Sequence, residues 1–398
     1  MTDTTVNPAL EAMFSALAVN QARLSSLAQN ALSTGADLAL KGDYAGAERQ
    51  FKRAVGLDPS SSNAAKAFDL LATVYIEQNK TEDAIKAYKA SISMVPSDDN
   101  AHVKLGNIYF DQKQYADAKK EYKAAVNINP TSSTNRYSLG QVYLATGRNQ
   151  EAENIFKQVI SIDPTQYAGY YSLGQTYSKE GRFTEAIAQF HKVLGMKHDF
   201  YTAYVDLGSA YADQGNMNDA REQLSILAEK APDKASILSA YLEKVTKPKI
   251  ISAYSTDGFL STVGPGTSVT TLSPQLSSPD TSWVFSMVFI FNKEMDASSV
   301  QDVNNWSILK STSDQPGGAY NWGLERPSTD AALSPIPLSV IYNDEYNTAT
   351  VSFLIKQNST SNATIDPSHI VFSFRGKDVY GNTIDPSADQ YSGISLVV

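Results

Sequence analysis

The sequence predicts two architectures in one chain: an α-solenoid of stacked helical hairpins, followed by an antiparallel β-sandwich. Two observations carry this prediction. A pattern of small and aromatic residues recurs every 34 residues in the first part of the chain, and apolar residues change to a period of two after Pro248. All three tryptophans also follow Pro248. Because 398 residues exceed what one ordinary hydrophobic core supports, separate domains are expected.

The repeated unit contains a Leu-Gly pair followed three residues later by tyrosine. Leu105-Gly106-Tyr109 is one copy, and the pattern recurs with a constant period up to Leu207-Gly208-Tyr211. Later in each unit come a small residue and then a large apolar one, and several units close with proline. Two earlier units, which end at Pro59 and Pro96, bring the total to six repeats over roughly residues 28–232.

This pattern resembles the tetratricopeptide repeat. In that family the small residues permit close approach of two antiparallel helices, and the aromatic residues fill the space between neighbouring hairpins. Apolar residues at i, i+3, i+4 and i+7 within each half-unit predict amphipathic helices, and glycines stand where each hairpin must turn. These turn glycines are Gly147, Gly181 and Gly215.

Three segments follow from these patterns. We expect an N-terminal helix in residues 1–29, a solenoid with a closing helix in residues 30–247, and a β domain in residues 248–398. The N-terminal helix, expected from Pro8 to Asn30, either caps the first repeat or contacts a neighbouring subunit, because an unanchored polar start normally lacks order. A closing helix is expected over 234–246, since Pro248 cannot continue it.

The resemblance also implies a concave groove lined by the first helix of each hairpin. Here the fifth, ninth and twelfth repeat positions hold mainly amides and aromatic or aliphatic side chains. We expect an extended polypeptide segment to bind there, since amides pair with a peptide backbone and tyrosines give rigid contact area. A solvated face without a ligand is the alternative. The expected partner-binding residues are Val103, Asn107, Phe110, Tyr137, Gln141, Leu144, Tyr171, Gln175 and Ser209.

The C-terminal part alternates apolar and polar residues in short runs, which predicts strands. These runs cover 249–254, 283–291, 338–342, 348–355 and 369–374. The strings FIFNKEMDASSV, at 289–300, and DVYGNTIDP, at 378–386, resemble bacterial immunoglobulin-like domains of surface and secreted proteins. The resemblance implies an immunoglobulin-like sandwich.

Two long segments of the C-terminal part, 260–282 and 311–335, are rich in turn-forming residues and are expected to be loops. The second contains Tyr320 and Trp322. Both are candidate surface contacts for a glycan or a partner, and burial of Trp322 against the sandwich is the alternative.

No catalytic, metal or cofactor site is expected. The four histidines show no zinc-binding spacing, cysteine is absent, and neither a phosphate-binding loop nor a nucleophile motif occurs. The net charge of −9 gives no basic field for nucleic acid, and no segment reaches transmembrane length.

Together these features favour a non-enzymatic interaction or structural protein. Its expected partner is a protein or peptide segment, with another copy of the chain as one candidate, and a homo-oligomer or larger assembly is expected. The immunoglobulin-like resemblance suggests an extracellular or cell-surface location, although the start of the chain lacks the basic region of a signal peptide. The alternative is a cytoplasmic adaptor that organises a protein complex.

Overall fold

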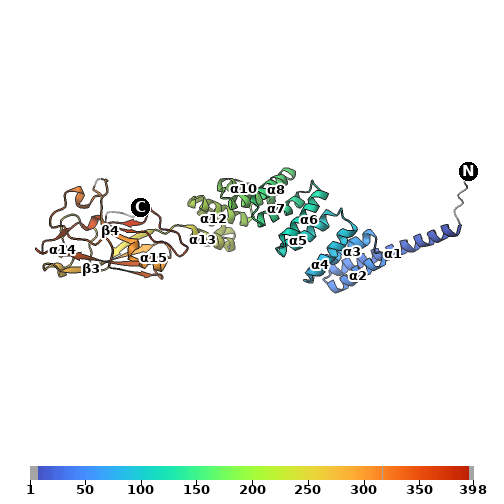
Figure 1. Cartoon of the computed structure of the whole chain (residues 1–398), viewed down its shortest axis with the longest axis horizontal. Helices are drawn as coiled ribbons and strands as arrows, with labels where there is room; N and C mark the ends of the chain where they lie inside the picture. The colour runs from blue at the N-terminus through green and yellow to red at the C-terminus, as the bar shows by residue number, and fades with distance from the viewer. Residues whose placement is uncertain (1–7, 316, 394–398) are drawn as a thin grey trace. The chain divides into compact units, whose positions relative to one another are not determined.

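The computed structural model describes residues 8–315 and 317–393 (Figure 1). The chain divides into two compact units, Met1–Leu238 and Ser239–Val398. The first is helical and the second is β-rich, as the sequence predicts. The expected polar start, residues 1–7, lies outside the described residues.

Six helical hairpins build the helical unit, and a further helix follows them, α13 (Pro232–Val245). In each hairpin an odd-numbered helix packs against the next even-numbered one. The hairpins are α1 (Pro8–Leu40) with α2 (Tyr44–Leu57), α3 (Ser62–Glu77) with α4 (Thr81–Met94), α5 (Asp99–Asp111) with α6 (Tyr115–Ile128), α7 (Ser133–Ala145) with α8 (Asn149–Ile162), α9 (Tyr167–Lys179) with α10 (Phe183–Met196), and α11 (Tyr201–Asp213) with α12 (Met217–Lys230).

A glycine of the first helix lies against the aromatic ring of the second helix in every hairpin from the third to the fifth. A Cβ atom added at Gly174 would lie 2.7 Å from the ring of Phe190, which is fully buried. Since real Cβ atoms do not approach another atom so closely, only glycine permits this helix spacing. The equivalent pairs are Gly106 with Tyr122 and Gly140 with Phe156, each at 2.6 Å.

The sixth hairpin has no aromatic residue at this position, and the closing helix fills the space instead. A Cβ atom added at Gly208 would lie 2.5 Å from Leu238 of α13, and Leu238 is fully buried. The prediction of a closing helix is therefore confirmed, with bounds two residues earlier than expected at its start. The last residues of α13 belong to the second unit, where Lys293 donates to the carbonyl oxygens of Glu243 and Thr246.

The N-terminal helix is not a separate element. It is continuous with the first helix of hairpin one, so that α1 is 33 residues long. Burial begins near Leu24, and Ala28, Ala31 and Leu32 are core residues, whereas residues 9–23 are exposed. Residues 9–23 therefore do not cap the first repeat, because they are exposed and extend beyond the helix that they were expected to cover.

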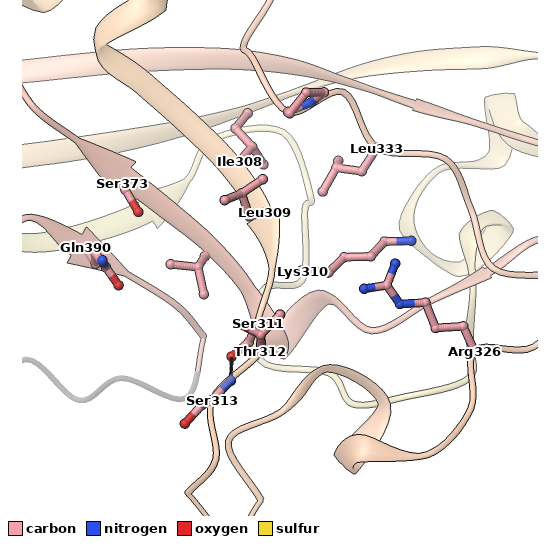
Figure 2. A pocket seen from close by; sticks show the side chains of 12 residues that line it. Ile308, Leu309, Lys310, Ser311, Thr312, Ser313, Arg326, Leu333, Ser373 and Gln390 are labelled. Atoms are coloured by element: carbon pink, nitrogen blue, oxygen red, sulfur yellow. Dashed lines mark hydrogen bonds between the residues drawn. The ribbon is translucent and has the colours of Figure 1, made fainter.

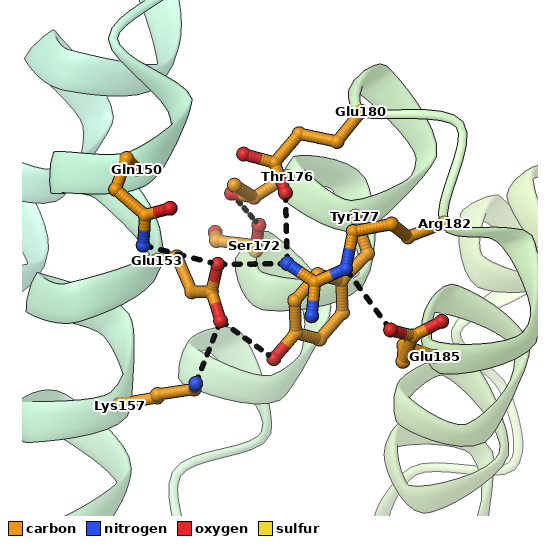
Figure 3. A network of polar contacts seen from close by, with 9 residues as sticks. All are labelled: Gln150, Glu153, Lys157, Ser172, Thr176, Tyr177, Glu180, Arg182 and Glu185. Atoms are coloured by element: carbon orange, nitrogen blue, oxygen red, sulfur yellow. Dashed lines mark hydrogen bonds and ion pairs between the residues drawn. The ribbon is translucent and has the colours of Figure 1, made fainter.

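A buried carboxylate links the fourth and fifth hairpins (Figure 3). Glu153 of α8 is bonded to Tyr177 of α9, at 3.2 Å, and to Arg182, which precedes α10, at 2.9 Å. The ammonium nitrogen of Lys157, on the same helix, lies 2.6 Å from a carboxylate oxygen of Glu153. Burial opposes ionisation of Glu153, but the hydrogen bonds from Lys157 and Arg182 outweigh it and lower the pKa of this carboxyl below its ordinary value.

The β-rich unit has three antiparallel sheets (Figure 1). A four-stranded sheet has the order β1 (Ile250–Ser255), β3 (Ser282–Phe291), β6 (Thr348–Lys356), β5 (Ser339–Asn343). A three-stranded sheet has the order β4 (Trp306–Lys310), β8 (Ile370–Phe374), β9 (Gln390–Tyr391), and β2 (Thr267–Ser268) pairs with β7 (Thr364–Ile365). Short helical turns connect them: α14 (Val269–Leu272), η1 (Pro274–Leu276), α15 (Ala297–Gln301), η2 (Val303–Asn305), η3 (Tyr320–Gly323) and η4 (Pro367–His369).

Aromatic side chains join the two larger sheets. Phe289 of β3 lies 5.1 Å from Trp306 of β4, and Phe353 of β6 lies 5.2 Å from Phe372 of β8, between ring centroids. Such contacts form the shared core, so an antiparallel β architecture is confirmed. The finer immunoglobulin-like topology stays a prediction.

The two segments expected as loops contain short regular elements. Residues 260–282 include β2, α14 and η1, and residues 311–335 include η3. The physical reason in the first segment is that Val269, Leu272 and Leu276 are buried in the shared core. An apolar side chain that enters a core fixes the backbone around it.

We expect Gly174→Ala to destabilise the helical unit by about 1–3 kcal/mol, because the new methyl group overpacks against Phe190. Gly195→Ala is the matched control. Gly195 lies in α10, the helix that contains Phe190, and no atom would contact its Cβ. Alanine there should therefore leave stability unchanged or raise it by up to about 1 kcal/mol. Urea unfolding followed by the helical circular dichroism signal measures both. Equal midpoints for the two variants would contradict the close-packing argument.

We expect Glu153→Gln to cost about 1–3 kcal/mol at neutral pH through loss of charged hydrogen bonds. The pKa of Glu153 is lowered in the folded state, so its contribution is present above the unfolded-state pKa and is lost as pH falls through the folded value. The variant and the wild type should therefore converge in acid. Glu229→Gln is the control, because Glu229 is exposed and, among the residues that the structure describes, forms an ion pair with its neighbour Lys230 alone. A difference that persists unchanged in acid would contradict this role.

Candidate functional site

The first helices of successive hairpins contact one another and form one face of the helical unit, here called the inner wall. It consists of α5, α7, α9 and α11. Along this wall the fifth residue of one repeat meets the sixth residue of the next. Two such pairs on the wall are hydrogen-bonded, Tyr137 with Ser172 and Tyr171 with Asp206. Asp69 of the preceding first helix, α3, is bonded to Lys104 of α5 in the same way.

The glutamines expected in the groove reinforce these pairs. Gln141 donates to Ser172 at 2.8 Å. Gln175 donates both to the Tyr171 hydroxyl, at 3.0 Å, and to Asp206, at 3.2 Å. The rings of Tyr137 and Tyr171 also pack, tilted, against Phe156 and Phe190 of the second helices. The two tyrosines are thus held rigidly, half-buried, on the inner wall.

The other expected groove residues differ in their exposure. Asn107 is exposed and accepts a hydrogen bond from Tyr122, and Phe110 and Ser209 are half-buried. Val103 and Leu144 are buried in the core of the helical unit, so they offer little surface to a partner. The expectation of contact at these two positions is corrected, because their side chains fill the space between neighbouring first helices. Binding by the remaining residues stays a prediction.

The inner wall contains a cavity of about 190 Å³ at the fifth and sixth repeats. Tyr171 and Gln175 both donate a hydrogen bond to Asp206, which lines this cavity. Its lining residues are Gln175, Ser178, Lys179, Phe190, Asp206, Ser209, Ala210 and Asp213. Gln175 and Ser209 are among the residues expected from the sequence, whereas Asp206 is not. The signal was an aspartate at a repeat position where the two preceding repeats have serine, Ser138 and Ser172.

Burial determines the electrostatics of this cavity. It raises the pKa of the Asp206 carboxyl above its ordinary value, and the hydrogen bonds from Tyr171 and Gln175 offset only part of this effect. Burial and the charge of Asp206 likewise raise the pKa of the Tyr171 hydroxyl, which stays protonated and donates to Asp206 at 2.6 Å. The site therefore presents a carboxylate in a partly desolvated position.

A second cavity, of about 640 Å³, lies on the outer face of the three-stranded sheet (Figure 2). Figure 2 shows the side chains of Lys310 and Arg326 extending toward one another beside β4. Lys310 is paired with Asp330 at 2.6 Å. The cations of Lys310 and Arg326 lie 4.9 and 5.6 Å from the ring centroid of Tyr320, so this ring positions both.

The two candidate contact residues of the second long segment behave differently. Tyr320 is 5% exposed, and its hydroxyl donates to Asp330 and accepts from the backbone of Asp366. The expectation of surface contact at Tyr320 is therefore corrected, because its ring and hydroxyl stabilise the fold. Trp322 is 65% exposed, so the alternative of burial is wrong and the indole is available to a ligand.

Comparison with known proteins identifies the repeats. Residues 72–112 match a family model described as a TPR repeat, and residues 109–175 and 177–241 match one described as a tetratricopeptide repeat. The sequence-based prediction of tetratricopeptide repeats is thus supported over residues 72–241. No curated protein matches the chain.

Several crystal structures are similar to the helical part. MamA protein is 26% identical, with 44% of this chain and 96% of that chain covered and a TM-score of 0.40. A tetratricopeptide repeat protein from Parabacteroides merdae is 16% identical, with 55% and 89% covered and a TM-score of 0.49. YrrB, described as a TPR protein with an unusual peptide-binding site, is 21% identical, with 48% and 97% covered and a TM-score of 0.41. Within the described residues, no helix is both long and apolar enough to cross a membrane.

We expect Asp206→Asn to raise the stability of the helical unit at neutral pH. Because the pKa of Asp206 is raised in the folded state, the folded protein binds this proton more tightly than the unfolded chain does, and stability falls as pH rises above the unfolded-state pKa. Asparagine has no charge to desolvate, so the difference in melting temperature should vanish in acid. Asp111→Asn, at the exposed end of α5, is the control. A variant less stable than the wild type at neutral pH would show that the hydrogen bonds of the carboxylate outweigh its burial.

Proposed function

We propose that the inner wall of the helical unit binds an extended polypeptide segment of a protein partner. Tetratricopeptide repeats mediate protein interactions and are typically non-catalytic. The observation that carries the proposal is the fixed geometry of Tyr137 and Tyr171, which hydrogen bonds across adjacent repeats hold at the wall. A surface ordered before binding loses less conformational entropy when the partner arrives.

The amides beside these tyrosines suit a peptide ligand. Each glutamine has two N–H donors and a carbonyl acceptor, and only some of these groups are used within the chain. Gln141 and Gln175 occupy equivalent positions in adjacent repeats. They can therefore pair with backbone groups at two points along one extended segment. Val103 and Leu144 are buried beneath the wall, so we do not propose that they contact the peptide.

An array of N-acetylated synthetic decapeptides of varied sequence tests this proposal. The intact protein should bind a subset of the array, and Gln141→Glu and Gln175→Glu should each weaken that binding at least about tenfold, a loss of about 1.4 kcal/mol. Glutamate lacks the donors of the amide and adds a charge beside Asp206 in the case of Gln175. The control is Gln301→Glu, which makes the same charge change at an exposed position of the β-rich unit. If the intact protein binds no peptide, or all three variants bind alike, the proposal is wrong.

A second observation favours association between copies of the chain. The exposed half of α1 carries apolar side chains at helical spacing, Leu10, Met13, Phe14 and Leu17, each about half exposed. Between residues 9 and 22 Glu11 is the only charged residue. Two such faces can therefore meet with little burial of charge, and association removes an apolar stripe from water.

We expect the triple variant Leu10→Gln, Phe14→Gln, Leu17→Gln to lower the average mass at a given concentration, as measured by light scattering. The substitutions keep the helix, since glutamine is a good helix former, and Ala28 and the core beyond it are untouched. A control triple variant places glutamine at Ala9, Ala12 and Ala16 of the same segment. A wild-type monomer at all concentrations, or a triple variant that still associates, would rule out α1 as the contact.

For the location of the protein we rely on the sequence alone. An extracellular or cell-surface site is proposed on the basis of the immunoglobulin-like resemblance, with a cytoplasmic adaptor as the alternative. Detection of the intact protein in fractionated cells separates the two.

A further inference from the structure

The cavity at the fifth and sixth repeats contains a carboxylate without a cationic partner. Among the residues that the structure describes, Asp206 is bonded to the neutral groups of Tyr171 and Gln175 and to no lysine or arginine. Both donors approach the same oxygen, Oδ2. The other carboxylate oxygen keeps its full capacity to accept hydrogen bonds. A desolvated carboxylate in this state gains more from an incoming cation than an exposed one does.

A second polar atom of the cavity is also unsatisfied. The hydroxyl oxygen of Ser178 is buried and has no hydrogen-bond partner, although it lines the same cavity as Asp206. A buried hydroxyl without a partner is costly, typically by about 1–3 kcal/mol.

The charges around the cavity favour a cationic occupant. Asp213 supplies a second carboxylate to the lining. The one lysine of the lining, Lys179, donates to the carbonyl oxygen of Leu144 in the preceding repeat at 3.3 Å, so the two carboxylates leave the lining with a net negative charge. Phe190 borders the same space and can pack against an aliphatic stem. The volume of about 190 Å³ is that of roughly six water molecules, which fits the end of a long side chain.

We propose that this cavity binds a basic side chain, lysine or arginine, of the segment that occupies the inner wall. Asp206 accepts the charged hydrogen bond, Asp213 adds to the attraction, and the hydroxyl group of Ser209 accepts a further N–H donor. The inference rests on the proposed binding function and specifies its partner: an extended segment with a basic residue positioned between the fifth and sixth repeats.

The experiment compares matched peptide pairs. Each basic decapeptide that the intact protein binds is resynthesised with glutamine at each lysine or arginine in turn, and affinities are measured by fluorescence anisotropy. At one of these positions, replacement by glutamine should lower the affinity at least about tenfold, and replacement at the others should have a smaller effect. In Asp206→Asn the ratio between the basic and the glutamine peptide should fall to about one. Asp213→Asn, which leaves the bonds of Tyr171 and Gln175 intact, should reduce the ratio partly.

Asp111→Asn is the control and should keep the wild-type ratio, since it removes the same charge elsewhere on the chain. Binding of peptides without any preference for a basic residue would overturn the inference and leave the proposed function standing. A preference that survives in Asp206→Asn would also overturn it. A preference that appears only when the peptide has a free amino terminus would show that the cavity takes a terminal ammonium group and not a side chain. Binding of no peptide by the intact protein would overturn the proposed function and this inference with it.

Discussion

The contact between a glycine of the first helix and an aromatic ring of the second controls the geometry of the helical unit. At Gly106, Gly140 and Gly174 there is no room for a Cβ atom, so each pair of helices approaches to the distance that the ring itself sets. Because the same contact recurs at a constant period, successive hairpins stack in the same way. The sixth hairpin lacks the ring, and Leu238 of α13 takes its place against Gly208. The end of the stack is thus closed by the same kind of close packing that builds it.

This regular stacking also creates the candidate site. It brings the fifth residue of each repeat next to the sixth residue of the following one, so that Tyr171 and Asp206, 35 residues apart in sequence, are hydrogen-bonded. The bond fixes the tyrosine but draws the carboxylate into a partly desolvated position, which raises its pKa. Such a residue lowers folding stability at neutral pH and increases affinity for a cation, which is a common compromise at binding sites. Glu153 differs from Asp206, because its charge is compensated within the chain by the cations of Lys157 and Arg182.

The β-rich unit depends on a different kind of packing. Its two larger sheets meet through aromatic rings, among them Phe289, Trp306 and Phe372. A buried charge of this unit is neutralised by a partner of the same unit. Lys293 and Asp378 form a buried ion pair at 2.7 Å, and the hydrogen bonds of Asp378 and the lysine hold the pKa of this carboxyl low despite its burial. Outside the core, Trp322 has a backbone φ of 53°, a left-handed conformation that costs energy for a bulky residue. The indole of this residue is exposed.

The sequence by itself determined the architecture. The period of 34 residues, the turn glycines and the switch to alternating strands depend on local chemistry that repeats or alternates along the chain, so six hairpins, a closing helix and five of the strands could be predicted. It also indicated the polar character of the inner wall at Tyr137, Gln141, Tyr171 and Gln175. What it could not give was the neighbour of each side chain. The burial of Val103, Leu144 and Tyr320, the exposure of Trp322 and the uncompensated charge of Asp206 arise only when segments distant in sequence pack together, because burial and charge balance belong to the assembled structure and not to any one residue.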